Sequence, residues 1–412
     1  MSDSTLSVTM AKEICLTGAD VLFPGEGVRS VPITLVYKDG QGKILALREH
    51  PSCDQPSLNL QGYLVAPGLI DLQLNGAFGL DFTTETSAIW QVAERLPTLG
   101  LTSFLPTVIT SPLTTIESAR QQLLAGYPSR ASLPCTEPLG LHIEGPFLNP
   151  AFKGAHRIEH LTLAVPSHIQ HWCVENGVAL VTLAPELPGA ETAIELLSRN
   201  GVIVSMGHSD ATYEQAMSGV RAGARMATHL FNAMRPIHHR EPGIMVASLD
   251  TPLAVGLIPD GIHVHPALLR LVHQAKQRAE IIIVTDAMSA LGYPPGVYKL
   301  AGKDVFVDVQ SARLADGTLA GSVVLPLDAV QNYQKFTQCS LADAWYGMST
   351  APADLLRRPD KGRIVPGADA DLLILHQTAN GLRLVATITR GRLAYCTDSK
   401  ITQFWKQTHD TL

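Results

Sequence analysis

Eight short apolar runs, separated by longer amphipathic stretches, constrain the fold of this chain more than any other feature. Several of the connecting stretches, such as 87–99, 113–125 and 213–222, place apolar residues at helical spacing. The eight runs cover residues 68–73, 103–108, 140–143, 180–184, 202–206, 224–228, 253–257 and 281–284. Uninterrupted apolar runs are typical of parallel strands covered on both faces, and eight strand–helix units close a parallel barrel. The sequence therefore predicts an α/β fold built on a (β/α)8 TIM-like barrel, with a doubly wound open sheet as the alternative.

The two ends of the chain follow a different pattern, with short strand-like runs separated by turn residues. Before residue 64, Asp39-Gly40 separates two such runs, and this dipeptide favours a hairpin turn. Residues 367–375, with the sequence GADADLLIL, and residues 384–388 return to the strand pattern. We therefore predict a small β-sandwich domain formed by both chain ends. Its expected parts are residues 1–62 and 365–412, on either side of a barrel at residues 63–364.

Charge and composition argue against several classes of partner. The 412 residues carry a formal net charge of −6, and lysines and arginines form no cluster of the kind that binds nucleic acid. No apolar run approaches the ~20 residues of a membrane span, and the first residues lack the pattern of a secretion signal. The six cysteines are scattered without a C-x-x-C pair, as in reduced cytosolic proteins. We expect a cytoplasmic protein with no nucleic-acid or membrane partner.

Polar residues follow four of the predicted strands at the point where each strand ends. Glu144 ends the third run, His208 follows the fifth, His229 follows the sixth and Asp286 follows the eighth. Barrel enzymes keep their active sites at the carboxyl ends of the strands, so these side chains are expected at one mouth. One carboxylate and two imidazoles make a three-ligand metal site with an open position for water, as metal-dependent hydrolysis requires.

Several motifs in order along the chain carry a resemblance to a known family. They are GLID from residue 68, LHIEGPFLNPAFKGAH from 141, MGHSDATY from 206, THLFNAM from 228, HHREPG from 238, PDGIHV from 259 and VTDAM from 284. With these motifs the chain resembles the N-acetylglucosamine-6-phosphate deacetylases of the amidohydrolase superfamily. The resemblance covers nearly the whole chain and implies a (β/α)8 barrel with a β-sandwich made from both termini.

The resemblance also implies roles for individual residues. Glu144, His208 and His229 would hold one divalent metal per chain, a Zn²⁺ ion with Fe²⁺, Mn²⁺ or Co²⁺ as alternatives. Asp286 would act as the acid/base that moves a proton from water to the amine leaving group. His156 would polarise the acetyl carbonyl. The expected substrate contacts are Gln73, Ala155, Asn232, Ala233, Arg240, His263, Leu319, Ala320, Gly321 and Ser322.

The resemblance further implies how the phosphate of the substrate is bound. Arg240 and His263 suit a phosphate group, because a guanidinium offers a planar fork of donors and an imidazole adds another donor. A homodimer is expected, in which Arg240 reaches the active site of the neighbouring subunit.

One departure from the wider superfamily concerns the number of metals. Many amidohydrolases carry His-x-His after the first strand to hold a second metal, whereas this chain has Gln73 and Asn75 there. Amides are poorer ligands than imidazole for zinc-type ions, and residues 180–186 contain no lysine that could bridge two metals. The sequence therefore favours a single metal, and Gln73 is free to help position the substrate.

The expected function is hydrolysis of N-acetyl-D-glucosamine 6-phosphate to D-glucosamine 6-phosphate and acetate in amino-sugar catabolism. Three alternatives stay open. The first is that the substrate is the galactosamine epimer. The second is a different reaction, such as the opening of a cyclic amide, and the third is a catalytically inactive scaffold of the same fold. The EGP and HHREPG motifs speak against cyclic amide opening, and the presence of all four site residues speaks against an inactive scaffold.

Overall fold

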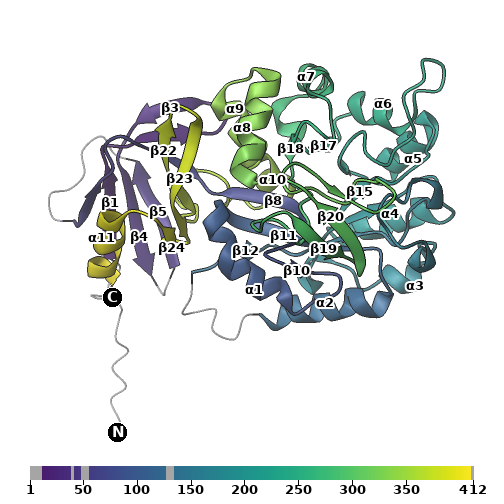
Figure 1. Ribbon diagram of the computed structural model, residues 1–412, viewed down its shortest axis with the longest axis horizontal. Helices are drawn as coiled ribbons and strands as arrows, with labels where there is room; N and C mark the ends of the chain where they lie inside the picture. Colours follow the sequence, from purple (N-terminus) through teal and green to yellow (C-terminus); the bar gives the residue numbers. More distant parts are fainter. Residues whose placement is uncertain (1–11, 39–40, 48–54, 127–133, 410–412) are drawn as a thin grey trace, which may run out of the picture.

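The computed structural model describes residues 12–38, 41–47, 55–126 and 134–409. Figure 1 shows two parts, a large barrel with helices around it and a smaller group of β-sheets beside it. The smaller part contains strands from both chain ends, drawn in purple and yellow. Within the described residues, no helix combines the length and the apolar character that crossing a bilayer requires.

The barrel strands coincide with the eight apolar runs, which confirms the prediction of a TIM-like barrel over the doubly wound sheet. Their hydrogen-bonded order follows the sequence from β11 to β18, and β8 pairs with β11 at the other end of the series. A parallel bridge between Leu74 and Ala287 joins the end of β8 to the segment after β18. The strands are β8 (Leu69–Leu74), β11 (Leu101–Ile109), β13 (Leu141–Glu144), β14 (Val178–Leu183), β15 (Ile203–Met206), β16 (Met226–Ala227), β17 (Ala254–Leu257) and β18 (Ile281–Ile283).

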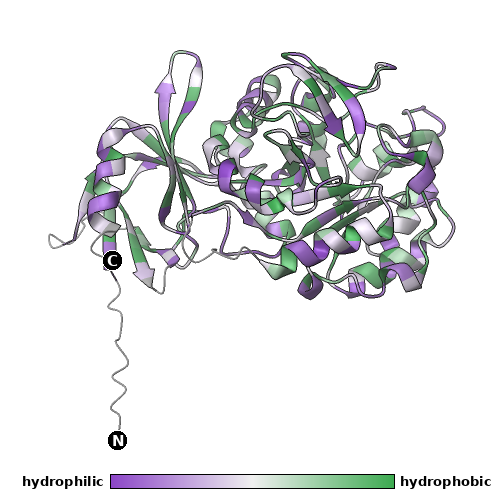
Figure 2. Ribbon diagram, turned by 60° about the horizontal axis from the view of Figure 1, so that its bottom comes forward, coloured by the Kyte–Doolittle hydropathy of each residue, from purple (hydrophilic) through white to green (hydrophobic). Residues whose placement is uncertain are grey.

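Helices cover the outer face of the barrel, which explains why the strands show no alternation of polar and apolar residues. Every residue of β8, β11 and β14 is buried. In Figure 2 the inner strands have mostly hydrophobic colours, while the helices carry hydrophilic residues on their outer faces. The helices are α1 (Ala88–Arg95), α2 (Leu113–Ala125), α4 (Ala190–Arg199), α5 (Tyr213–Ala222), α6 (Gly243–Leu249), α7 (Pro266–Ala275), α8 (Pro326–Thr337) and α9 (Leu341–Tyr346). A further helix, α10 (Thr350–Leu355), packs against a separate apolar cluster of strand residues.

The smaller part contains two sheets, and one of them combines strands from the two ends of the chain. Its strand order is β24-β23-β22-β7-β2-β3, so that C-terminal β22 (Leu372–Thr378) pairs with N-terminal β7 (Tyr63–Pro67). The other strands are β2 (Asp20–Phe23), β3 (Gly27–Ser30), β23 (Gly381–Thr389) and β24 (Arg392–Cys396). The predicted union of both chain ends in one β-structure is thereby confirmed.

The second sheet is built from N-terminal strands alone, in the order β5-β4-β1-β6. Its strands are β1 (Lys12–Thr17), β4 (Ile33–Lys38), β5 (Gln41–Leu47) and β6 (Ser57–Asn59). The pair β4 and β5 is antiparallel, while the predicted turn at Asp39-Gly40 lies outside the described residues. Apolar side chains from both sheets and from α11 (Ser399–His409) form a common core.

A buried lysine connects the C-terminal segment to the barrel. The side chain of Lys361 is 1% exposed, and its Nζ lies 2.8 Å from Glu137 Oε2 in β12 (Glu137–Pro138), a short strand beside the start of β11. The same Nζ lies 2.7 Å from Asp369 Oδ2 and 2.8 Å from Asp371 Oδ2. Three carboxylates therefore surround the ammonium group of Lys361, one from β12 and two from the segment that leads to β22.

A small antiparallel sheet follows the last barrel strand. It consists of β19 (Gly296–Leu300), β20 (Lys303–Val307) and β21 (Ala312–Arg313). Leu300 and Arg313 from this sheet line the cavity at the barrel mouth. The sheet therefore forms one wall of the site at the carboxyl ends of the strands.

Candidate active site

A cavity of about 490 Å³ lies at the carboxyl ends of the barrel strands, where the sequence predicted the site. It collects residues from strand ends that are far apart in the sequence, which is the usual arrangement in this fold. The predicted site residues that line it are Glu144, Ala155, His156, His208, His229, Asn232, Ala233, His263, Asp286, Leu319 and Gly321.

Glu144, His208 and His229 bring three potential metal-binding atoms close together. Glu144 Oε1 lies 3.2 Å from His208 Nε2 and 3.1 Å from His229 Nε2, and the two imidazole nitrogens are 3.1 Å apart. Ligands that surround a zinc-type ion at ~2.0–2.1 Å in a tetrahedron are separated by similar distances. All three residues are buried, so an unpaired charge among them would be costly.

Hydrogen bonding behind His208 shows that this cluster suits a cation. His208 Nδ1 lies 2.9 Å from the carbonyl oxygen of Phe152, so Nδ1 carries the proton and donates it. If Nε2 carries no proton, its lone pair points at the carboxylate oxygen of Glu144. Two acceptors at 3.2 Å repel each other unless a proton or a metal ion lies between them. A divalent metal bound by both atoms would satisfy this arrangement.

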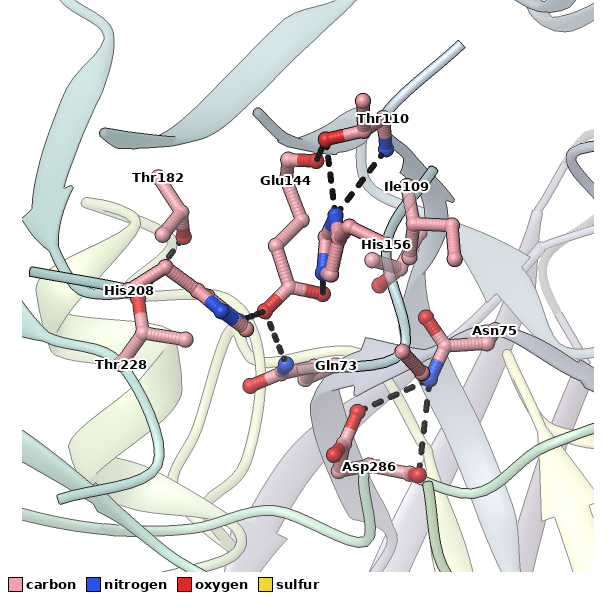
Figure 3. Close-up of polar contacts among 12 residues, drawn as sticks. Gln73, Asn75, Ile109, Thr110, Glu144, His156, Thr182, His208, Thr228 and Asp286 are labelled. Carbon is pink, nitrogen blue, oxygen red and sulfur yellow. Dashed lines mark hydrogen bonds and ion pairs between the residues drawn. The ribbon is translucent and has the colours of Figure 1, made fainter. Parts of the chain in front are cut away.

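His156 faces the same carboxylate from the other side, as Figure 3 shows. Its Nε2 lies 3.9 Å from Glu144 Oε2. Its Nδ1 accepts a hydrogen bond from the backbone N–H of Thr110 at 3.3 Å and lies 2.7 Å from the hydroxyl of the same residue. Burial, together with the nearby His208, holds the pKa of His156 well below its usual value. The ring is therefore neutral, with its proton on Nε2 toward the cavity.

Asp286 lies beside this group at the end of the last strand. Burial, with the Glu144 carboxylate nearby, raises the pKa of Asp286 to about 6. Its Oδ1 accepts a hydrogen bond from Asn75 Nδ2 at 2.8 Å. The preceding residue, Thr285, is held by buried Asp71, which accepts from its backbone N–H and its hydroxyl. A carboxyl group with a pKa near neutrality can exchange a proton at physiological pH, as an acid/base must.

The backbone at three of these positions adopts the left-handed region, which side chains other than glycine rarely occupy. The φ angles are 50° at His208, 26° at His229 and 48° at Asp286. Such conformations cost free energy and persist where the surrounding structure holds them, often at functional sites. Glu186 contributes to this support, because it accepts hydrogen bonds from Ser209 and Asp210 next to His208.

The remaining predicted contacts are placed differently. Gln73 is buried and donates a hydrogen bond to Glu144 Oε1 at 3.1 Å. The hydroxyl of Ser322 donates a hydrogen bond to the backbone carbonyl of Thr285. Ala320 is buried in the neighbouring loop and does not line the cavity. Arg240 is exposed, its Nη1 lies 2.8 Å from His239 Nε2, and it does not line the cavity of its own chain.

Sequence reasoning did not predict the supporting contacts of Asn75, Thr110 and Asp260. Asn75, Thr110 and Asp260 contact Asp286, His156 and His263, respectively. Asp260 is three residues before His263 within the PDGIHV motif, so that pair had a local signal in the sequence. The contacts of Asn75 and Thr110 join distant segments, and a single sequence carries no signal for them.

Comparisons with known proteins identify the family of this chain. The sequence model of the amidohydrolase family matches residues 64–397. The N-acetylglucosamine-6-phosphate deacetylase of Bos taurus is 39% identical over 353 residues, which are 81% of this chain and 84% of the relative. The protein of that name from Bacillus subtilis (strain 168) is 37% identical over 341 residues, covering 81% of this chain and 85% of the relative.

Solved structures give the same result. The crystal structure of N-acetylglucosamine-6-phosphate deacetylase from Pasteurella multocida has a TM-score of 0.83 and 31% identity, covering 92% of this chain and 98% of that one. A mutant of the N-acetyl-D-glucosamine-6-phosphate deacetylase from Mycobacterium smegmatis was solved in complex with N-acetyl-D-glucosamine-6-phosphate. It has a TM-score of 0.83 and 30% identity, and the match covers 93% of this chain and 99% of that one. The chain thus belongs to the amidohydrolase family and, within it, to the N-acetylglucosamine-6-phosphate deacetylases.

Proposed function

We propose that this protein hydrolyses N-acetyl-D-glucosamine 6-phosphate to D-glucosamine 6-phosphate and acetate. The observation that carries the proposal is that five buried side chains line one cavity, those of Glu144, His208, His229, His156 and Asp286. The substrate is the compound named in the relatives of this chain, one of which was solved with it bound.

The side chains divide the chemical work among them. Glu144, His208 and His229 would hold a divalent metal, which would supply Lewis-acid activation of water and of the acetyl carbonyl. Asp286 takes a proton from the attacking water and gives it to the sugar nitrogen as the C–N bond breaks. His156 directs its Nε2–H toward the cavity and stabilises the negative charge that develops on the acetyl oxygen.

The walls of the cavity hold the sugar phosphate. We assign this role to Ala155, Asn232, Ala233, His263, Leu319 and Gly321, which line the cavity. Gln73 acts through Glu144, to which it donates a hydrogen bond, and Ser322 acts through the backbone of Thr285. Ala320 contributes through the loop that carries Leu319 and Gly321.

The proposal extends to the metal, the assembly and the setting of the enzyme. One metal per chain is supported by the amides at Gln73 and Asn75, and we propose zinc for it. We propose a homodimer with Arg240 reaching the neighbouring site, because a phosphate needs a charged donor and Arg240 is exposed on its own chain. We also propose a cytoplasmic location and a domain boundary at residues 364/365. The boundary expected at 62/63 moves to the end of β7 (Tyr63–Pro67), because β7 pairs with β2 and β22 in the smaller part.

An acetate-release assay on N-acetylglucosamine 6-phosphate, with and without chelator, tests the proposed function. Acetate should form at a rate that saturates with substrate, and removal of metal should abolish it. The galactosamine epimer and unphosphorylated N-acetylglucosamine serve as comparison substrates. Equal or faster turnover of either one would contradict the proposed substrate, and no release from any of them would contradict the reaction.

A further inference from the structure

The side-chain amide of Asn75 holds the carboxylate of Asp286 in a defined position. Asn75 is 2% exposed at the end of β8, and its Nδ2 lies 2.8 Å from Asp286 Oδ1 and 3.4 Å from the carbonyl oxygen of the same residue. Figure 3 shows both contacts as dashed lines on one side of the group that surrounds Glu144. The amide thus spans the side chain and the backbone of one residue.

The orientation of this amide is determined by Asp286. If the amide were reversed, its oxygen would face the two acceptor oxygens of Asp286, and all three would repel each other. In the orientation adopted, Asn75 Oδ1 is buried and has no hydrogen-bond partner among the described residues. A buried acceptor without a partner costs free energy, so the position of the amide is unfavourable for its own oxygen. The hydrogen bond from Asn75 Nδ2 to Asp286 offsets this cost.

The backbones of the two segments are also joined at this point. The N–H of Asn75 donates to the carbonyl oxygen of Ala287 at 2.8 Å, next to the bridge between Leu74 and Ala287. This is the seam where the first barrel strand meets the segment after the last one. The backbone that carries the Asn75 side chain is therefore held in place. The side chain contacts Asp286, whose φ of 48° is maintained by its surroundings.

The contact leaves the other carboxylate oxygen of Asp286 free for chemistry. Within the described part of the chain, no hydrogen bond reaches Oδ2 of Asp286, and the residue lines the cavity. A carboxylate with both oxygens unpaired can turn about its Cβ–Cγ bond. Holding Oδ1 limits this rotation and directs Oδ2 toward the reacting atoms, which is the preorganisation that proton transfer needs.

We infer that Asn75 is a positioning residue for catalysis, which orients the Asp286 carboxylate through a hydrogen bond to Oδ1. The inference rests on the proposed function, in which Asp286 moves the proton. Asn75 also lines the cavity, and its amide is assigned to Asp286 rather than to the substrate or the metal. Its effect should therefore fall on kcat, while KM and metal content stay close to those of the wild type.

Two variants and one control test the inference. Asn75→Ala removes the donor, and Asn75→Asp keeps the shape but places a second carboxylate against Asp286. The control is Thr107→Val, because the Thr107 hydroxyl accepts from the backbone N–H of Leu74 at 3.0 Å, next to Asn75, without contacting Asp286. All three proteins are compared by kcat and KM for N-acetylglucosamine 6-phosphate, bound metal, thermal unfolding and the pH dependence of kcat.

Asn75→Ala should lower kcat by roughly 10- to 100-fold with KM within about twofold of wild type, the size expected for a lost hydrogen bond to a charged group. Asn75→Asp should move the acidic limb of the kcat–pH profile to higher pH, because neighbouring carboxylates raise each other's pKa. Thr107→Val should keep kcat within about twofold. A merely structural Asn75 would lower thermal stability as Thr107→Val does and leave the pH profile unmoved.

Two results would overturn the inference. One is a kcat for Asn75→Ala equal to that of Thr107→Val, and the other is an acidic limb for Asn75→Asp that coincides with the wild-type limb. Failure of the proposed function is recognised separately. In that case wild type releases no acetate, or Asp286→Asn keeps its activity whatever residue stands at position 75.

Discussion

Nδ1 of His263 lies 2.5 Å from Oδ2 of Asp260, and both side chains are almost completely buried beside the cavity. The second oxygen of Asp260 accepts the backbone N–H groups of Ile262 and His263. Burial alone would raise the pKa of Asp260, but the hydrogen bond from His263 and these N–H groups hold the pKa below its usual value. The ionised Asp260 keeps a proton on Nδ1 and fixes the direction in which the other ring nitrogen points.

We predict that Asp260→Asn weakens binding of the phosphorylated sugar without slowing the chemical step. His263 is proposed to contact the substrate, so loss of its charged partner should raise KM roughly 10-fold, or ~1.4 kcal/mol, with kcat nearly unchanged. Steady-state kinetics on N-acetylglucosamine 6-phosphate measure both values. The same change in a His263→Ala background is the control, and an equal rise in KM there would show that Asp260 does not act through His263.

Asp286→Asn should abolish turnover while the protein keeps its metal and its affinity for substrate. An amide cannot take a proton from water, and general acid–base catalysis contributes ~10²–10⁴-fold, so kcat should fall by about three orders of magnitude or more. Single-turnover kinetics measure the rate of the chemical step and the affinity for substrate, and elemental analysis measures the bound metal. A variant that retains a tenth of the wild-type kcat would place the acid/base elsewhere.

Much of the barrel and the gathering of polar side chains at its mouth could be predicted from the sequence, because both depend on local patterns. Buried parallel strands are continuous apolar runs, and Glu144, His208 and Asp286 come at or directly after strand ends, which a barrel brings together. The contact between Asn75 and Asp286 spans 211 residues of sequence and depends on how the barrel closes. The left-handed backbone at His208 and Asp286 is likewise maintained by tertiary contacts, and local propensity argues against it.

Metal content should be one ion per chain in active preparations. The mutual distances among Glu144, His208 and His229 fit one ion, and the amides of Gln73 and Asn75 are poor ligands for a second zinc-type ion. Elemental analysis of His208→Ala or His229→Ala should show loss of most of the metal, with Asp286→Asn as the control that keeps it. Two ions per chain in an active wild-type preparation would contradict this prediction.

Lys361→Met should destabilise the protein strongly. The ammonium group is buried among three carboxylates, which outweigh the effect of burial and hold the pKa of Lys361 above its usual value. Removing one partner of a buried ion pair costs ~3–5 kcal/mol, since the other charges are left uncompensated. Chemical denaturation of Lys361→Met and of the exposed control Lys299→Met should separate this cost from that of losing a surface charge. Equal free energies of unfolding for the two variants would refute the prediction.

The same cluster predicts a dependence of stability on pH. Burial would raise the pKa of Glu137, but Lys361, Arg358 and Arg390 lower it from 4.5 to about 2. Glu137 therefore stabilises the folded state above about pH 4.5 and loses this contribution as the pH falls toward 2. The difference in free energy of unfolding between wild type and Glu137→Gln should be constant above that range and shrink within it. A difference that is independent of pH would contradict the assigned pKa.

Arg240→Ala should weaken binding of the phosphorylated substrate through the neighbouring subunit. A hydrogen bond to a charged group contributes ~1.5–3 kcal/mol, so KM for N-acetylglucosamine 6-phosphate should rise roughly 10- to 150-fold. Turnover of unphosphorylated N-acetylglucosamine should barely change, because it has no phosphate to contact. Arg199, an exposed helix residue paired with Glu195, offers a matched control, and Arg199→Ala should change neither value.

Hybrid dimers decide whether Arg240 acts across the interface. Mixing Asp286→Asn chains with Arg240→Ala chains creates dimers in which each subunit lacks one of the two groups. If Arg240 serves the neighbouring site, one site in each hybrid combines an intact Asp286 with the partner's arginine, and activity with low KM returns. If Arg240 serves its own chain, no site in the hybrid has both groups, and the mixture stays as weak as the Arg240→Ala parent. The exposed side chain of Arg240, outside the cavity of its own subunit, favours the first outcome.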